Sequence, residues 1–317
     1  MALKRLISLS VSISISFSCI QCSTQSKSEK ENAINNSELI VLGIAQDAGY
    51  PQIDCEKECC QAFWEGKREK ERVTCLGLID RIDKKAFLVE ASPDIYSQWQ
   101  SLKEECPECD IEGIVITHAH IGHYTGLMQL GREAMGAKNV KVFLLPRLAN
   151  FLRENGPWSQ LVTLGNIEII ELTKGTSYSL SRSLKVTPYL VPHRDEFSET
   201  AGFVFNGQEK KALFIPDIDK WDKWDKNIID EIKNVDYAFI DGTFFNEDEL
   251  PGRNMSEIPH PFIAESIDAF NNLDRMEKEK IQNSIRILSD KLQRIDDSLS
   301  QKHKSLSEYD KTLGETE

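Results

Sequence analysis

Short apolar runs rich in β-branched residues recur along the middle of the chain. Each run is bounded by polar or turn-forming residues, and several are separated by stretches with the apolar spacing of an amphipathic helix. The spacing predicts strands at 39–44, 73–79, 86–89, 113–117, 140–145, 167–172, 184–191, 201–205, 211–215 and 237–240. Strands that alternate with helices in this way indicate an α/β protein with substantial sheet.

A different pattern occupies residues 274–317. Apolar residues repeat there with heptad spacing, at Ile281, Ile285, Leu288, Leu292, Ile295, Leu299, Leu306 and Leu313. This spacing is typical of a coiled coil or a long helix, so we predict a helical, coiled-coil-like tail. We favour pairing of the tail between chains, which would give a homo-oligomer. The alternative is a helix that packs on its own domain and covers a sheet edge.

The first residues have the order of a bacterial lipoprotein signal. A short basic start precedes an apolar, serine-rich stretch, which is followed by Cys19 and Cys22. We predict a signal over 1–22 with lipidation at one of these cysteines, then a polar tether over 23–37. The protein would be exported and held on the periplasmic side as a membrane-anchored lipoprotein. The alternative is a cytosolic protein with an apolar start.

The composition restricts the classes of partner. The 317 residues include 38 Lys and Arg against 51 Asp and Glu, which gives a formal charge of −13. Sequence-independent nucleic-acid binding needs a basic surface, so we expect no nucleic-acid partner. No apolar run reaches the about 18 residues that a membrane-spanning helix needs.

Three of the six histidines lie together directly after the predicted strand 113–117. They are His118, His120 and His123. Residues two apart on an extended segment face the same way, so His118 and His120 can converge on one ion. Neutral imidazoles at this spacing suit Zn²⁺ or a similar cation. The alternative is an exposed histidine cluster at the end of a strand.

This His-x-His-x-x-His segment resembles the signature of the metallo-β-lactamase superfamily. The segment 191–196, which contains His193, resembles the third metal motif of that family, and 213–217 resembles the fourth. The resemblance is closer to the branch that contains PqqB, of pyrroloquinoline quinone biosynthesis, and a cyclic phosphodiesterase of the carbon–phosphorus lyase pathway. The segments that carry it are 41–52, 240–245 and 258–261.

The resemblance implies a metallo-β-lactamase-like αββα sandwich, which we place at residues 38–273, with the metal site at one edge of the two sheets. The implied metal ligands are His118, His120, His193, His123 and Asp217. The first and second histidines of the cluster, together with His193, form the ligand set of a catalytic zinc with an open fourth position.

Two departures from the family pattern weaken the second metal site. The family usually has Asp before the last histidine of the cluster, where this chain has Gly122. A later histidine that completes the second site has no match after Lys280. His123 and Asp217 would then be the only protein ligands there, so we predict one firmly bound Zn²⁺ and a second ion that is weak or absent.

The resemblance assigns catalytic roles to His260, as an acid or a stabiliser of charge on the substrate, and to Asp217, which can bridge two metals. The alternative for His260 is a surface-loop histidine. Asp241 is a further carboxylate candidate, although a carboxylate that ends a strand is more often a turn or cap residue. Asp195 and Glu196 could orient His193, or they could be solvated loop charges.

Cysteines form two groups after the signal. Cys55, Cys59 and Cys60 lie where the branch often holds a structural zinc, so we predict a structural Zn²⁺ or a disulfide there. Cys106 and Cys109 form a C-x-x-C loop. For this loop a zinc or a disulfide is favoured over a redox motif.

The sequence therefore favours a metal-dependent hydrolase. It would use zinc-activated water on an ester, phosphodiester or related bond of a small-molecule substrate. The alternative is a catalytically degenerate protein of the same fold that acts as a binding or assembly module. The complete set of His118, His120 and His193 favours the first, whereas Gly122 favours the second.

Overall fold

The computed structural model describes residues 36–250, 252–271, 273–278 and 280–281. The predicted signal with Cys19 and Cys22, nearly all of the tether and the heptads after Ile281 lie outside the described residues. Within the described part of the chain, no helix is both long enough and apolar enough to cross a membrane.

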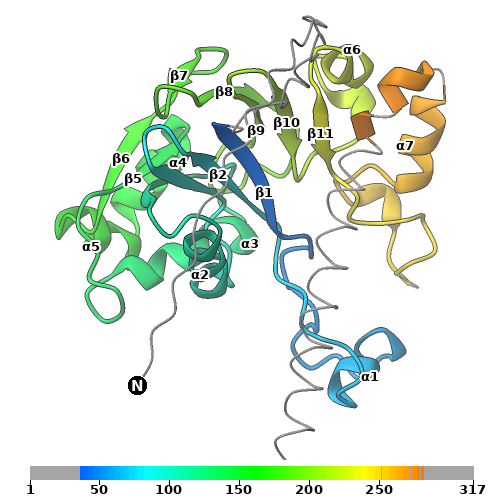
Figure 1. Cartoon of the computed structure of the whole chain (residues 1–317). Helices are drawn as coiled ribbons and strands as arrows, with labels where there is room; N and C mark the ends of the chain where they lie inside the picture. Colours follow the sequence, from blue (N-terminus) through cyan, green and yellow to red (C-terminus); the bar gives the residue numbers. More distant parts are fainter. Residues whose placement is uncertain (1–35, 251, 272, 279, 282–317) are drawn as a thin grey trace, which may run out of the picture. The chain divides into compact units, whose positions relative to one another are not determined.

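Two sheets form the centre of the domain (Figure 1). In spatial order, the first sheet contains β1 (Ser37–Gly43), β2 (Cys75–Asp80), β3 (Lys85–Val89), β4 (Asp110–Val115), β5 (Val140–Leu144) and β6 (Ile167–Glu171). The second contains β11 (Tyr237–Ile240), β10 (Lys211–Ile215), β9 (Ala201–Asn206), β8 (Lys185–Leu190) and β7 (Tyr178–Ser179). Each predicted strand is present, and the short β7 is the one strand of the described chain that was not predicted.

The two sheets pack face to face because alternate residues of their strands are apolar on the inner side. On β2 and β3 the inward side chains are those of Leu76, Leu78, Phe87 and Val89. They share one buried cluster with Phe203, Phe205 and Phe214 of the second sheet.

Helices cover the outer faces of both sheets. The first sheet packs against α2 (Ile95–Glu105), η1 (Thr125–Leu130), α4 (Pro146–Glu154) and α5 (Trp158–Thr163). The second packs against α6 (Ile228–Lys233) and α7 (Ile263–Phe270), and Ile281 joins the same cluster. The remaining short helices are α1 (Glu58–Trp64), α3 (Ile121–Tyr124), η2 (Trp221–Lys223) and η3 (Met255–Glu257). The layers are therefore helix, sheet, sheet, helix, and the predicted αββα sandwich is confirmed.

Candidate metal centre

The candidate site lies where strands of both sheets end. His118 follows β4, His193 follows β8, and Asp217 follows β10. Because β8 and β10 are both antiparallel to β9, their carboxyl ends meet at the same edge of the second sheet. The topology thus brings together residues that are distant in the sequence.

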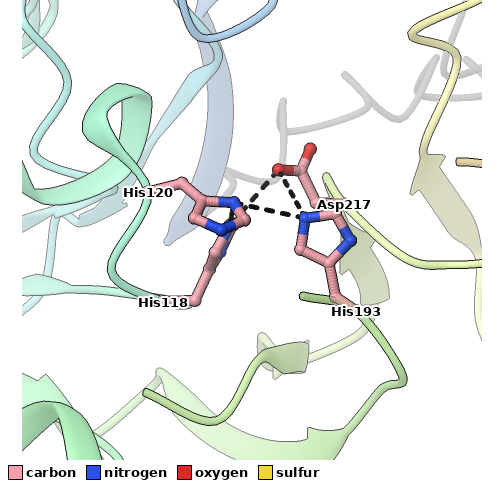
Figure 2. A group of neighbouring side chains, drawn as sticks. All are labelled: His118, His120, His193 and Asp217. Atoms are coloured by element: carbon pink, nitrogen blue, oxygen red, sulfur yellow. Dashed lines mark hydrogen bonds and ion pairs between the residues drawn. The ribbon is translucent and has the colours of Figure 1, made fainter. Parts of the chain in front are cut away.

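Three histidines and an aspartate point toward one another in this site (Figure 2). His120 Nδ1 lies 3.0 Å from His118 Nε2 and 3.2 Å from His193 Nε2. Asp217 Oδ2 lies 3.3 Å from His118 Nε2 and 3.7 Å from His193 Nε2. Zinc–nitrogen bonds of about 2.0–2.1 Å in tetrahedral geometry place ligand atoms about 3.3 Å apart. The separations between the histidine nitrogens fit a zinc ion held by the three histidines with a fourth position left for water, and Asp217 Oδ2 borders that position.

The outer nitrogens of the same rings are held by oxygen atoms. His118 Nδ1 lies 2.9 Å from Thr117 Oγ1, and His120 Nε2 lies 3.1 Å from Glu196 Oε2. His193 Nδ1 donates to the carbonyl oxygen of Pro259 at 3.1 Å. Because a carbonyl only accepts, the ring of His193 carries a proton on its outer nitrogen.

The inner nitrogen of His193 is therefore free to bind a cation, and it lies 3.2 Å from Nδ1 of His120. Burial lowers the pKa of His118 to about 3 and that of His193 to about 4. Both rings are neutral near neutral pH, as zinc ligands must be.

A second group adjoins the first and contains a residue that the sequence did not indicate. His123 Nε2 lies 2.9 Å from Asp47 Oδ1 and 3.2 Å from Asp217 Oδ2. On the other side of the ring, His123 Nδ1 faces Glu90 Oε1 at 3.4 Å, and both side chains are fully buried. The expected pair of His123 and Asp217 thus becomes a group of three potential ligands backed by a carboxylate.

The charges of this group are strongly coupled. Burial alone would lower the pKa of His123, but the carboxylates of Asp217 and Glu90 outweigh it and raise that pKa well above its ordinary value. Burial would raise the pKa of Asp217, but the charge of His123 and a hydrogen bond with His118 hold it well below its usual range. The carboxylates of Asp47 and Asp217 thus lie against the same nitrogen of His123, a position that favours a positive charge, either a proton or a metal ion in its place.

His260 lies beside the first group. Its Nδ1 is 2.7 Å from Asp241 Oδ2, its ring centroid is 5.1 Å from that of His193, and one of its nitrogens lies within 4.8 Å of an Asp217 oxygen. Asp241 also accepts from the backbone N–H groups of Ile218 and Thr243. Asp241 is thus a cap residue, as its position suggested, and also orients His260. Burial works against the charged ring, but the bond to Asp241 outweighs it and raises the pKa of His260.

Neither of the two loop carboxylates orients His193, which was one of the two alternatives that the sequence left open. Glu196 contacts His120 rather than His193. Asp195 accepts from the hydroxyl of Thr200 at 3.0 Å, away from the histidines. His193 is oriented by a backbone carbonyl instead, which no side-chain pattern could indicate.

The cysteine groups also differ from each other. Cys55, Cys59 and Cys60 are free thiols. The Sγ atom of Cys59 lies 3.9 Å from that of Cys55 and 4.0 Å from that of Cys60. Zinc–sulfur bonds of about 2.3 Å place sulfur atoms about 3.8 Å apart, so this trio fits a zinc ion better than a disulfide. Cys106 and Cys109 form a disulfide, one of the two arrangements favoured for that loop.

The sandwich and the histidine site at its edge define a protein of the metallo-β-lactamase fold. The family model described as the beta-lactamase superfamily domain matches residues 85–281, more than half of the chain. The chain therefore belongs to the metallo-β-lactamase superfamily, in its PqqB-like branch. A second family model, microtubule nucleation factor SSNA1, matches residues 264–317.

Individual relatives agree with this assignment. Coenzyme PQQ synthesis protein B of Rhizobium meliloti strain 1021 is 26% identical over 272 residues, which covers 77% of this chain and 86% of that protein. Zn²⁺-bound PqqB from Methylobacterium extorquens has a TM-score of 0.59 at 18% identity, covering 70% of this chain and 80% of that one. A diphosphatase of the PhnP family has a TM-score of 0.54 at 19% identity, covering 75% of this chain and 82% of that one. The fold and family are those of metal-dependent, hydrolase-like proteins.

Proposed function

We propose that this protein is a zinc-dependent hydrolase that cleaves an ester, phosphodiester or related bond in a small molecule. The observation that carries the proposal is the convergence of His118, His120 and His193 on one point, with their remaining nitrogens held by neighbouring oxygen atoms. Zinc bound there supplies a water molecule of lowered pKa and a Lewis acid that polarises a substrate oxygen.

The side chains around the centre suit the other tasks of hydrolysis. Although burial opposes it, the bond to Asp241 raises the pKa of His260, and this favours a role for the ring as the acid that protonates the leaving group of the substrate. Asp241 fixes the orientation of that ring through its bond to Nδ1. Glu196 and the Pro259 carbonyl hold His120 and His193 in position for the metal.

A cavity of about 550 Å³ next to the centre supports a small-molecule substrate. Apolar side chains such as Leu76 and Phe214 line much of it. Asp47, Asp217 and Asp241 border it. A substrate with an apolar part in this cavity would place its polar, reacting group at the metal centre. The PhnP-family diphosphatase among the structural neighbours makes phosphoesters the first compounds to test.

Removal and return of the metal test the proposal. We expect the zinc-loaded protein to hydrolyse a nitrophenyl ester or a bis(nitrophenyl) phosphodiester, to lose that activity after chelation and dialysis, and to regain it when zinc is added. Absorbance of the released nitrophenol measures the rate. A folded, zinc-loaded protein that hydrolyses none of a panel of esters, phosphodiesters and diphosphates would instead support a role as a binding or assembly module.

We further propose that the protein is an exported lipoprotein, on the basis of the signal-like residues 1–22. Because an acyl anchor holds a protein to a bilayer without a spanning helix, the wild-type protein should sediment with membranes. The double variant Cys19→Ser/Cys22→Ser should move to the soluble fraction, and a variant at the distant Cys75 should not. Ultracentrifugation of cell fractions measures this. Wild-type protein recovered from the cytosol with Met1 still in place would rule out the lipoprotein.

A further inference from the structure

Position 122 and Asp47 compete for the same space. A Cβ atom added to Gly122 would lie 2.4 Å from Asp47 Oδ1 and 2.7 Å from the Asp47 Cα atom. Separations under about 3 Å do not occur for real Cβ atoms, and one of these two contacts is with backbone. The chain therefore has no room for a side chain at 122 while Asp47 is in place. The carboxylate that the family pattern puts at 122 is replaced here by one from a different loop.

The loop that carries Asp47 is firmly held. The N–H groups of Ile44 and Ala45 both donate to the carbonyl of Arg72, and the N–H of Thr74 donates back to Ala45. A tight turn follows, in which the N–H of Gly49 donates to the carbonyl of Gln46 at 2.8 Å. Asp47 lies inside this turn, so its carboxylate is placed by backbone hydrogen bonds rather than by the contact with His123 alone.

The three side chains that meet at this point form a ligand set. Asp47 Oδ1 and Asp217 Oδ2 lie 2.9 and 3.2 Å from His123 Nε2, and the three ligand atoms lie within 4.8 Å of one another. Glu90 faces the opposite nitrogen of the ring, which is the arrangement that orients a metal-binding histidine. Asp217 Oδ2 also lies 3.3 Å from His118 Nε2, so one carboxylate serves both groups.

We propose that Asp47, His123 and Asp217 form a second divalent-metal site, in which Asp47 replaces the carboxylate missing at position 122. Two carboxylates and one imidazole make this site harder than the three-histidine site, so it accepts Mn²⁺ as well as Zn²⁺. The inference deepens the proposed function and rests on it for the identity of the first site. It also raises the expected number of protein ligands for the second ion from two to three.

Direct metal binding tests the inference without an activity assay. In a Cys59→Ser/Cys60→Ser background, which removes the competing thiols, the protein is loaded at the first site with one equivalent of zinc. Mn²⁺ is then titrated in by calorimetry and followed by electron paramagnetic resonance. We expect one Mn²⁺ per wild-type chain. Asp47→Ala should weaken Mn²⁺ binding by more than the about 10- to 100-fold that loss of an outer partner causes. Asp110→Ala, at an exposed carboxylate on β4, is the matched control and should leave Mn²⁺ binding unchanged.

An exchange of the two positions makes the test specific. The double variant Asp47→Gly/Gly122→Asp removes the side chain at 47 and supplies a carboxylate from position 122 instead. It should therefore restore much of the Mn²⁺ affinity that Asp47→Gly alone loses. Gly122→Asp alone should lower the melting temperature because of the clash. No Mn²⁺ binding by the wild-type protein, or equal binding by folded Asp47→Ala, overturns the inference. Failure of the proposed function is a separate result: either the three histidines hold no zinc, or the zinc-loaded protein hydrolyses none of the test substrates.

Discussion

Replacement of His118 and His120 by alanine is expected to remove the zinc of the first site and to abolish hydrolysis. Two of the three converging nitrogens disappear, and His193 with Asp217 leaves too few ligands for tight binding. A bound metal contributes several kcal/mol of transition-state stabilisation, so the rate should fall by about 10³-fold or more. Elemental analysis of zinc per chain and the nitrophenol assay measure the two effects.

Zinc bound by the three cysteines must be distinguished from zinc bound by the histidines when zinc per chain is measured. The same double variant is therefore compared in a Cys59→Ser/Cys60→Ser background, in which the cysteine trio no longer holds zinc. Since His118 is buried, His120→Ala alone serves as the milder variant, and circular dichroism shows whether each protein is folded. An unchanged zinc content in the folded double variant would show that the site assignment is wrong.

Replacement of His260 by alanine is expected to lower the hydrolysis rate by about 10²–10⁴-fold while zinc content stays constant. The reason is that His260 lies beside the ligands and has a raised pKa, while its Nδ1 is engaged by Asp241 rather than by the metal group. The effect should fall on kcat, because proton transfer belongs to the reaction step. Asp241→Asn should reduce kcat in the same direction, since it disturbs the orientation of the ring.

The exposed Glu257 ends η3, shortly before His260, and Glu257→Ala is the matched control that should leave kcat unchanged. Two results would contradict the assignment. A kcat equal to that of the wild type would make His260 a plain loop histidine, and a loss of zinc in parallel with activity would make it a metal ligand instead.

The sheet strands could be predicted because their sequence pattern is a direct result of burial. Every residue of β2 is buried, so this strand is free of charged and polar side chains from Cys75 to Ile79, and its last residue is the buried Asp80. The two residues of β7 are too few to produce a pattern. His118, His120 and His193 could be predicted for a similar reason. Each lies shortly after a strand that the pattern predicts, and histidines in such a position have few plausible roles other than metal binding.

Asp47 and Glu90 could not be found in this way. Asp47 and His123 are 76 residues apart, and they meet only because the loop after β1 is hydrogen-bonded to residues 72–74. Glu90 directly follows β3 and has a φ of 81°. No pattern in the neighbouring sequence indicates a buried carboxylate at this position. The available clue was the glycine at 122, which shows a missing side chain but not the residue that replaces it.

The carboxylate of Asp217 touches both groups of ligands, and this makes their affinities interdependent. An ion bound at either site would change the charge and orientation of Asp217, which the other site also uses. Thermodynamic linkage then requires reciprocity: whatever factor the first ion applies to the affinity for the second, the second applies to the first. The two metals would therefore be gained and lost as a cooperative or anticooperative pair, and the metal content of the protein would respond to supply as a coupled equilibrium rather than as two independent ones.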